Sequence, residues 1–172
     1  VGQLAVQLLR ANGCRVLGVD LDAARAKRAL DLGAQWSLAP DADHASWVAS
    51  ATGGHGADFA LVTAASESSA PLQLAAELCR MRGRIIAVGA TAMELDRRSF
   101  YAKELQLRMS MSYGPGRYDR SYEELGLDYP LAHVRWTENR NLQAFVALAA
   151  SGAIDPLRLD ARIVPFDDAL AT

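Results

Sequence analysis

The sequence predicts an α/β fold with a doubly wound, parallel β-sheet that carries helices on both faces. The first observation is that short apolar runs alternate with amphipathic segments of about a dozen residues, which is the pattern of βαβ crossover units. The second is that glycines mark the ends of these segments, where helices and strands stop. The third is size and composition, since 172 residues with 51% hydrophobic content can bury the core of one such domain.

The first elements alternate helix and strand. Residues 3–11 carry Leu and Ala at helical spacing and end in an Asn-Gly pair, a helix stop signal. Residues 15–19 form a nearly continuous apolar run, as expected of a strand covered on both faces. Residues 23–32 consist of good helix formers and end at a glycine, the residue favoured at a left-handed cap. Residues 35–38 predict a short strand.

The same alternation continues through the middle of the sequence. Residues 42–51 predict a modest helix, which a glycine-rich run stops, and residues 58–63 predict a strand. Residues 71–81 predict a helix with a proline in its first turn, where the missing N–H group costs nothing. Residues 84–88 form an apolar run that ends at a glycine and predicts the next strand.

After residue 91 this regular alternation changes. A short helix at 98–103 precedes residues 105–112, where apolar and polar side chains alternate, so we place this strand at the edge of the sheet with one face exposed. Residues 113–139 open with a Gly-Pro turn and continue as a polar and aromatic segment without a period, which we interpret as an ordered loop. The last predicted elements are a helix at 141–150, a short strand at 162–164 and the start of a helix at 166–172.

Composition narrows the classes of function. A net charge of −2 and a pI near 5.9 indicate neither nucleic acid nor an anionic membrane as partner. We find no apolar stretch long enough for a membrane span and no signal peptide. Cys14 and Cys79 lie far apart among apolar residues, which favours buried free thiols in a reducing compartment, and we expect a cytoplasmic protein. His44, His55 and His133 lack the spacing of metal ligands, so we predict no metal site.

The most informative motif joins Gly2, at the start of the first helix, to Asp20, at the end of the first strand. A helix-opening glycine and an acid about 20 residues later form the second half of a dinucleotide-binding fingerprint. The helix N-terminus offers N–H groups and partial positive charge to a pyrophosphate, and Asp20 accepts hydrogen bonds from ribose hydroxyls. We interpret residues 1–150 as a Rossmann-type dinucleotide-binding domain without its first strand, and residues 151–172 as the start of a return segment toward a further domain.

Both residues also have a plainer interpretation. A glycine at a helix start serves packing, and Asp20 or Asp22 suits the N-cap of the helix at 23–32. We assign the cap to Asp22 and the ribose to Asp20. NAD is then favoured over NADP, because a 2′-phosphate would bring nearly two negative charges against Asp20, and one charge pair at 4 Å corresponds to roughly 4 kcal/mol at an effective dielectric of 20. Arg25 would offset part of that repulsion without reversing it.

Small residues follow the later strands and complete the set of candidate cofactor-binding residues. Ligands of doubly wound sheets bind at the carboxyl ends of the strands, where small side chains permit close backbone approach. Ordinary tight turns explain each of these positions equally well. The residues are Thr63, Ala64, Val88, Gly89 and Ala90.

Two features of the chain leave structural alternatives open. The loop at 113–139 either lines a substrate pocket or packs on a neighbouring domain, and we favour the second. The missing first strand is central in the order 3-2-1-4-5-6, so the strands that end at Asp20 and Thr63 lose their shared neighbour. We expect another segment to fill the gap or the sheet to close up directly.

Three segments of the sequence resemble the coenzyme domain of the zinc-type alcohol dehydrogenase, or medium-chain dehydrogenase/reductase, superfamily. The resemblance rests on VGQLAVQLLRANGCRVLGVDLDAARAKRALDLGAQWSL, TGGHGADFALVTAAS and RGRIIAVGAT, and it covers about residues 1–112. The segment KELQLRMSMSYGPGRYDRSYEELGLDYPLAHVRWTENRNLQAF is similar to bacterial two-part oxidoreductases linked to polysaccharide synthesis.

This resemblance implies an NAD-binding domain that serves hydride transfer to or from an alcohol or carbonyl substrate, a sugar among the candidates. It implies a zinc site and a substrate pocket in a separate catalytic domain, so the catalytic residues are not assigned here. It also implies a homodimer formed through the edge strand at 105–112. The residues it places around the cofactor are Val1 and Gly2 near the nicotinamide ribose and pyrophosphate, Asp20 and Arg25 at the adenosine ribose, and Thr63, Ala64, Val88 and Gly89 beside adenosine and nicotinamide.

Functions of other classes remain as alternatives. A non-catalytic nucleotide-binding or assembly module would also lack catalytic residues. An adenosylmethionine-dependent methyltransferase shares the acidic ribose contact, but its sheet ends in a reversed hairpin, for which we find no turn signal. A short-chain dehydrogenase is disfavoured, because the spacing of Tyr101 and Lys103 does not suit that class.

Overall fold

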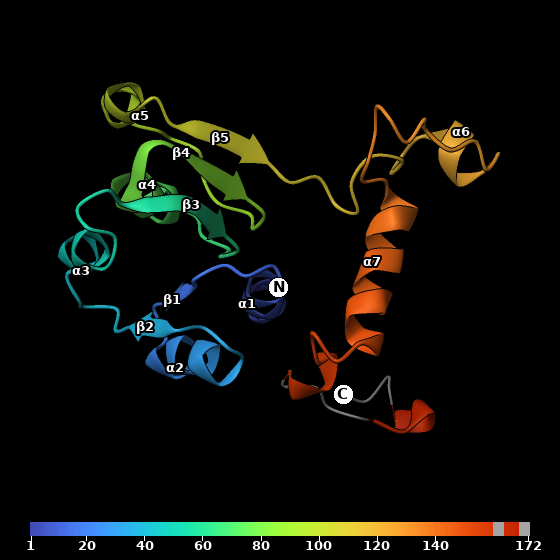
Figure 1. Ribbon diagram of the computed structural model, residues 1–172, viewed down its shortest axis with the longest axis horizontal. Coiled ribbons are helices and arrows are strands. Elements are labelled where there is room, and N and C mark those ends of the chain that lie inside the picture. Colours follow the sequence, from blue (N-terminus) through green and yellow to red (C-terminus); the bar gives the residue numbers. More distant parts are fainter. Residues whose placement is uncertain (160–163, 169–172) are drawn as a thin grey trace. The chain divides into compact units, whose positions relative to one another are not determined.

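A computed structural model describes residues 1–159 and 164–168 of the chain (Figure 1). Helices and parallel strands alternate along it, which confirms the predicted fold class. In chain order the elements are α1 (Gly2–Ala11), β1 (Leu17–Val19), α2 (Ala23–Asp31), β2 (Trp36–Leu38), α3 (His44–Ala51), β3 (Ala57–Val62), α4 (Ala70–Leu78), β4 (Cys79–Ala87), α5 (Arg97–Lys103), β5 (Gln106–Met109), α6 (Arg120–Glu123), α7 (Glu138–Ala150), and the 3₁₀ turns η1 (Pro156–Arg158) and η2 (Phe166–Asp168). The strand predicted at 162–164 and the helix predicted at 166–172 fall largely outside the described residues.

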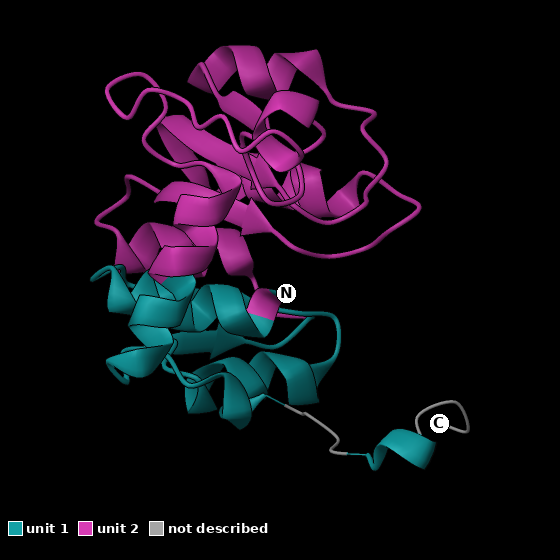
Figure 2. Ribbon diagram, turned by 90° about the vertical axis from the view of Figure 1, so that its right-hand side faces the viewer, with its two compact units in different colours: residues 1, 3–40, 145–172 teal, residues 2, 41–144 magenta. Residues whose placement is uncertain are grey.

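The chain divides into two compact units (Figure 2). The first comprises Val1, Gln3–Pro40 and Phe145–Thr172, and the second comprises Gly2 and Asp41–Ala144. The boundary that we placed at residue 150 concerns a different division, between this domain and a further one, and it stays a prediction.

In the first unit, β1 and β2 pair in parallel and α2 packs closely on them. Gly18 makes this approach possible, because a Cβ atom there would lie 2.5 Å from the Cβ of Ala29. The end of the unit is held by Gln7, a buried residue whose side-chain amide accepts from the backbone N–H of Asp155 at 2.6 Å and donates to its carbonyl at 3.2 Å. The core consists of Val6, Val16, Ala29, Leu32 and Ala34.

In the second unit, β3, β4 and β5 form a parallel sheet with β4 between the other two. The predicted edge position of β5 is confirmed, and its parallel pairing differs from the reversed hairpin of a methyltransferase sheet. The core consists of Val62, Leu72, Ala75, Ala76, Cys79, Ile85 and Ala87. Both cysteines are free thiols, as predicted, although only Cys79 is buried, and burial raises the pKa of its thiol.

One predicted boundary was wrong. The helix predicted at 71–81 ends at Leu78, and β4 begins at Cys79, well before the predicted strand at 84–88. The ladder with β3 pairs Ala57 with Cys79 and then shifts register, so Arg80–Gly83 bulges out before regular pairing resumes at Arg84.

The expectation for the missing central strand stays a prediction, because part of the chain beyond residue 159 lies outside the described residues. Among the described residues no strand joins the β1–β2 pair to the β3–β4–β5 sheet. Each sheet instead keeps its own hydrogen-bond ladder and its own core cluster.

Candidate functional site

An acidic pair lies at the carboxyl end of β1. Asp22 caps α2, because its Oδ1 atom accepts from the N–H groups of Ala24 at 2.8 Å and Arg25 at 3.3 Å, as we predicted. Asp20 stands outside this cap. Its Oδ1 atom accepts from the N–H of Asp22 at 3.0 Å, and no described residue donates to its Oδ2 atom. Asp20 therefore keeps one carboxylate oxygen for a ligand.

Two neighbours complete this end of the first unit. Arg25 points back toward the cap, with its Nε atom 3.7 Å from Asp22 Oδ2. Leu21 lies between the two acids and is 91% exposed. An isolated exposed leucine is common on protein surfaces, but one that directly follows an acid with a free carboxylate oxygen offers an apolar contact to the same ligand. Our sequence analysis missed Leu21, and its position directly after Asp20 is the signal that was available.

The second unit brings together the small residues that follow β3 and β4. The N–H groups of Val88 and Gly89 donate to the carbonyl of Val62 at 2.9 and 3.0 Å, so the two strand ends stay paired. A Cβ atom on Gly89 would lie 2.0 Å from the carbonyl oxygen of Ala64, and only glycine fits there. A bridge between Ser66 and Thr91 continues the ladder beyond the strands.

Gly2 belongs to the same unit. A Cβ atom on it would lie 2.9 Å from Thr63 Oγ1, so a larger residue would displace that hydroxyl. The predicted residues thus fall into two groups. Gly2, Thr63, Ala64, Val88, Gly89 and Ala90 gather in the second unit, and Val1, Asp20 and Arg25 lie in the first.

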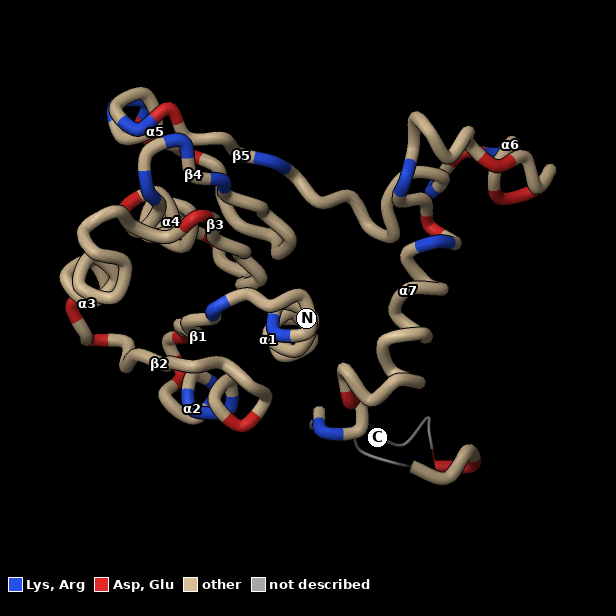
Figure 3. The backbone as a smooth tube through the Cα atoms, viewed as in Figure 1, with Lys and Arg blue, Asp and Glu red and all other residues tan. Residues whose placement is uncertain are grey.

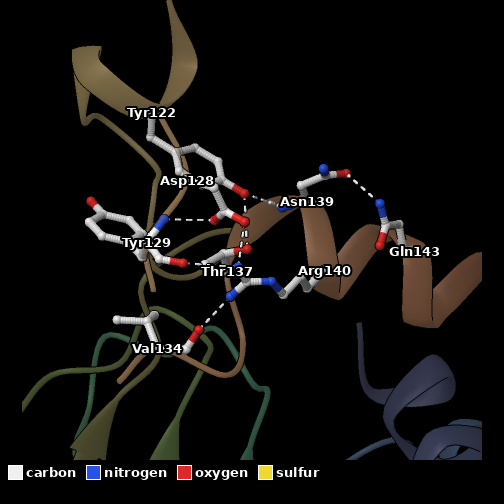
Figure 4. Close-up of polar contacts among 8 residues, drawn as sticks. All are labelled: Tyr122, Asp128, Tyr129, Val134, Thr137, Asn139, Arg140 and Gln143. Carbon is white, nitrogen blue, oxygen red and sulfur yellow. Dashed lines mark hydrogen bonds and ion pairs between the residues drawn. The ribbon is translucent and has the colours of Figure 1, made fainter. Parts of the chain in front are cut away.

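The polar segment at 113–139 is tied to the first turns of α7 (Figure 4). The hydroxyl of Tyr122 donates to Thr137 Oγ1 at 2.9 Å and accepts from the N–H of Asn139 at 3.2 Å. The guanidinium of Arg140 donates to the carbonyls of Val134 and Tyr129 and pairs with Asp128. Thr137 is fully buried by this arrangement.

Two Arg side chains of this segment stack on aromatic rings. Arg117 lies 5.3 Å from the ring of Tyr113 and 4.4 Å from that of Tyr118, and Arg135 lies 4.2 Å from that of Trp136. The Glu123 carboxylate beside Arg117 raises the pKa of that guanidinium further. The charged side chains of this segment are therefore largely paired with one another. Beyond its first turn, helix α7 carries no charged side chain (Figure 3).

The donor set for a metal is missing from this part of the protein. No three His, Cys, Asp or Glu side chains gather closely enough to hold an ion in the described ranges, so a catalytic zinc does not fit here. None of the helices at 1–159 or 164–168 combines the length and apolar character needed to cross a membrane.

Comparisons with known proteins agree with the parallel α/β fold described above. A family model described as zinc-binding dehydrogenase matches residues 1–126. The structure of alcohol dehydrogenase TADH from Thermus sp. ATN1 is 27% identical with a TM-score of 0.70, and the match covers 98% of this chain and 43% of that one. D-arabinose dehydrogenase from Sulfolobus solfataricus is 23% identical with a TM-score of 0.69, over 91% of this chain and 42% of that one. Mycobacterial Rv1454c, solved with NADPH, is 20% identical with a TM-score of 0.63, over 90% and 44%. None of the curated proteins matches the sequence.

A parallel α/β chain with an acid after its first strand and close-packed glycines after its later strands has the features of the dinucleotide-binding class of domain. The chain belongs to the zinc-binding dehydrogenase family. It spans about two fifths of the length of the solved structures that it resembles.

Proposed function

We propose that this chain is the NAD-binding domain of an oxidoreductase that transfers a hydride between the nicotinamide and an alcohol or carbonyl group. Membership of the dehydrogenase family supports the reaction class. Alcohols and sugars are candidate substrates because the chain is similar to an alcohol dehydrogenase and to a D-arabinose dehydrogenase. The observation that carries the proposal is the Asp20 carboxylate, half-buried at the end of β1 with one oxygen held and the other without a donor from the described residues.

Each unit, taken by itself, offers residues suited to a part of such a cofactor. Asp20 would accept from the adenosine ribose, with Arg25 beside it and Leu21 against the adenine. The glycine-dependent contacts of Gly2 with Thr63 and of Gly89 with Ala64 leave backbone free of side chains where a pyrophosphate and nicotinamide would approach. The bound nicotinamide would supply the hydride chemistry. The chain itself binds and orients the cofactor.

NAD is the preferred cofactor in this proposal. The fold does not decide the choice, since the structure of Rv1454c contains NADPH. The local charge favours NAD, because Asp20 would repel a 2′-phosphate and would accept the hydrogen bonds that a free ribose hydroxyl donates.

Calorimetric titration of the whole protein with NAD and NADP tests this assignment. We expect tighter binding of NAD, and we expect Asp20→Asn to weaken NAD binding about tenfold or more, because hydrogen bonds to charged groups contribute about 1.5–3 kcal/mol. Asp41→Asn makes the same chemical change on an exposed loop of the second unit and should leave both affinities unchanged. Equal or tighter binding of NADP by the unmodified protein would refute the role of Asp20.

The remaining parts of the proposal concern the substrate and zinc sites, the oligomeric state and the cellular compartment. A substrate pocket and a zinc site would lie outside this chain. A homodimer would form through the β5 edge, and two free thiols suit the cytoplasm.

A further inference from the structure

We infer that Asp22 is a second determinant of cofactor preference, which acts through its carboxylate by engaging Arg25, the cation that a 2′-phosphate beside Asp20 would need. The inference rests on the proposed function. It goes beyond it, because the fingerprint assigns the ribose to Asp20 alone and leaves Asp22 as a helix cap.

Every polar group of Asp22 has a partner in this corner of the first unit. Its N–H holds Asp20 Oδ1 at 3.0 Å, and its carbonyl accepts from the N–H of Ala26 at 2.9 Å. One carboxylate oxygen accepts from the N–H groups of Ala24 and Arg25, and the other lies 3.7 Å from the guanidinium of Arg25. The backbone of α2 thus fixes where the Asp22 carboxylate stands, and Arg25 is drawn to a fixed charge.

The charges of Asp20, Asp22 and Arg25 disfavour a 2′-phosphate in two ways, by repulsion and by occupying the cation. Asp20 and Asp22 are two acids against the single cation Arg25, so the three together carry one net negative charge at neutral pH. In such sites an arginine near the acid donates hydrogen bonds to a 2′-phosphate, but here Arg25 faces Asp22. Its side chain is 72% exposed, so it has room to turn once the attraction to Asp22 is removed.

The next arginine of α2 is placed differently. Arg28, one turn further on, donates to the carbonyl of Arg158 at 2.5 Å and pairs with Asp31 at 3.5 Å near the end of the helix. The Asp31–Arg28 pair therefore has the same sequence separation as Asp22–Arg25 but lies away from the acidic pair, which makes Asp31 a matched control.

The variant that tests the inference is Asp22→Asn, because asparagine also caps helices and keeps the N–H to Asp20 but carries no charge. Exposed ion pairs are weak, so the expected change is several-fold. We expect NADP to bind about three- to tenfold more tightly, with NAD affinity within about twofold of its original value. Asp22→Ser, another good cap, should give the same result and guards against a folding defect in the first variant.

Calorimetric titration of the whole protein with each cofactor provides the readout, and thermal unfolding confirms that the variants fold. Asp31→Asn should change neither affinity. Combining Asp22→Asn with Arg25→Gln should remove most of the gain for NADP, because the gain requires the freed guanidinium.

The outcomes separate the two proposals. Loss of affinity for both cofactors in parallel would show that Asp22 is only a cap, and an unchanged NADP:NAD ratio in both Asp22 variants would likewise overturn this inference. The Asp20 assignment would survive either result if Asp20→Asn still weakens NAD. A wild-type protein that binds neither cofactor would overturn both.

Discussion

At the scale of single residues, the hydrogen bond from the Tyr129 hydroxyl to Asp119 is a charged contact that sequence patterns do not reveal. It lowers the pKa of the Asp119 carboxyl and, from the other side, raises the pKa of Tyr129. Asp119 also caps α6 by accepting from the N–H of Ser121 at 2.9 Å. The ionised carboxylate thus stabilises the folded loop.

The pH dependence follows from the direction of that shift. A depressed pKa in the folded state means that Asp119 contributes stability above its unfolded pKa of about 3.9 and loses it as pH falls through the lower folded value. Tyr129→Phe should move the pKa of Asp119 back toward its ordinary value and weaken the acid-range dependence of unfolding. Carboxyl-carbon NMR titration would measure this, with the exposed Tyr101→Phe as control. An unshifted titration curve for Asp119 in the Tyr129 variant would contradict the assignment.

Sequence reasoning at this scale succeeded where the chemistry is local. Asp22 was predicted as the cap of α2 because the cap and the N–H groups that it binds are adjacent in sequence. The Asp119–Tyr129 and Tyr122–Thr137 contacts join residues of a segment without periodicity, so no spacing rule indicates them. The position of Leu21 directly after Asp20 was visible in the sequence, but its exposure, which makes it available to a ligand, is a property of the folded chain.

At the scale of elements, the end of α4 is set by a residue from α5. The ammonium of Lys103 donates to the carbonyls of Ala76 at 3.0 Å, Glu77 at 2.7 Å and Cys79 at 2.9 Å. These carbonyls lie at the C-terminal end of α4, where they lack partners within the helix and where the helix dipole favours a cation.

Lys103→Met keeps the apolar stem of this side chain and removes its charge and donors. We expect the free energy of unfolding to fall by about 1–3 kcal/mol, because partly buried carbonyls lose a charged donor. Denaturant unfolding measures the change. Lys27→Met, on the exposed face of α2, should have little effect. If Lys103→Met lowered the free energy of unfolding no more than the Lys27 control does, water would be satisfying these carbonyls in place of the ammonium.

This cap also explains why the predicted helix 71–81 ran too long. The pattern of good helix formers continues past Leu78, but Lys103 lies 24 residues after Cys79 and cannot be recognised as its partner from the sequence. Arg82 adopts a left-handed φ of 58° inside β4, a conformation that arginine does not signal. The alternation of helices and strands was predictable because hydrophobic periodicity is local, whereas these boundaries depend on tertiary contacts.

At the scale of the whole molecule, β5 remains the open edge of its sheet. One side of this strand pairs with β4 from Gln106 to Met109, and no strand among the described residues pairs with the other side. Met109 and Met111 are exposed at 62% and 55%. An open edge with apolar side chains is a template for pairing with another strand, so proteins cover such edges or use them for assembly.

A homodimer through β5 would cover that edge, since in a two-fold interface the same strand of each copy meets itself. Met109→Lys should shift the whole protein from dimer to monomer, because lysine on an edge strand opposes pairing and a two-fold interface would bring two added positive charges into the same small contact. Sedimentation velocity at several concentrations measures the change. Met93→Lys adds the same charge at an exposed methionine outside the strands and should leave the dimer intact. A dimer that persists equally in both variants would place the contact elsewhere on the protein, and a monomeric wild type would show that β5 stays uncovered.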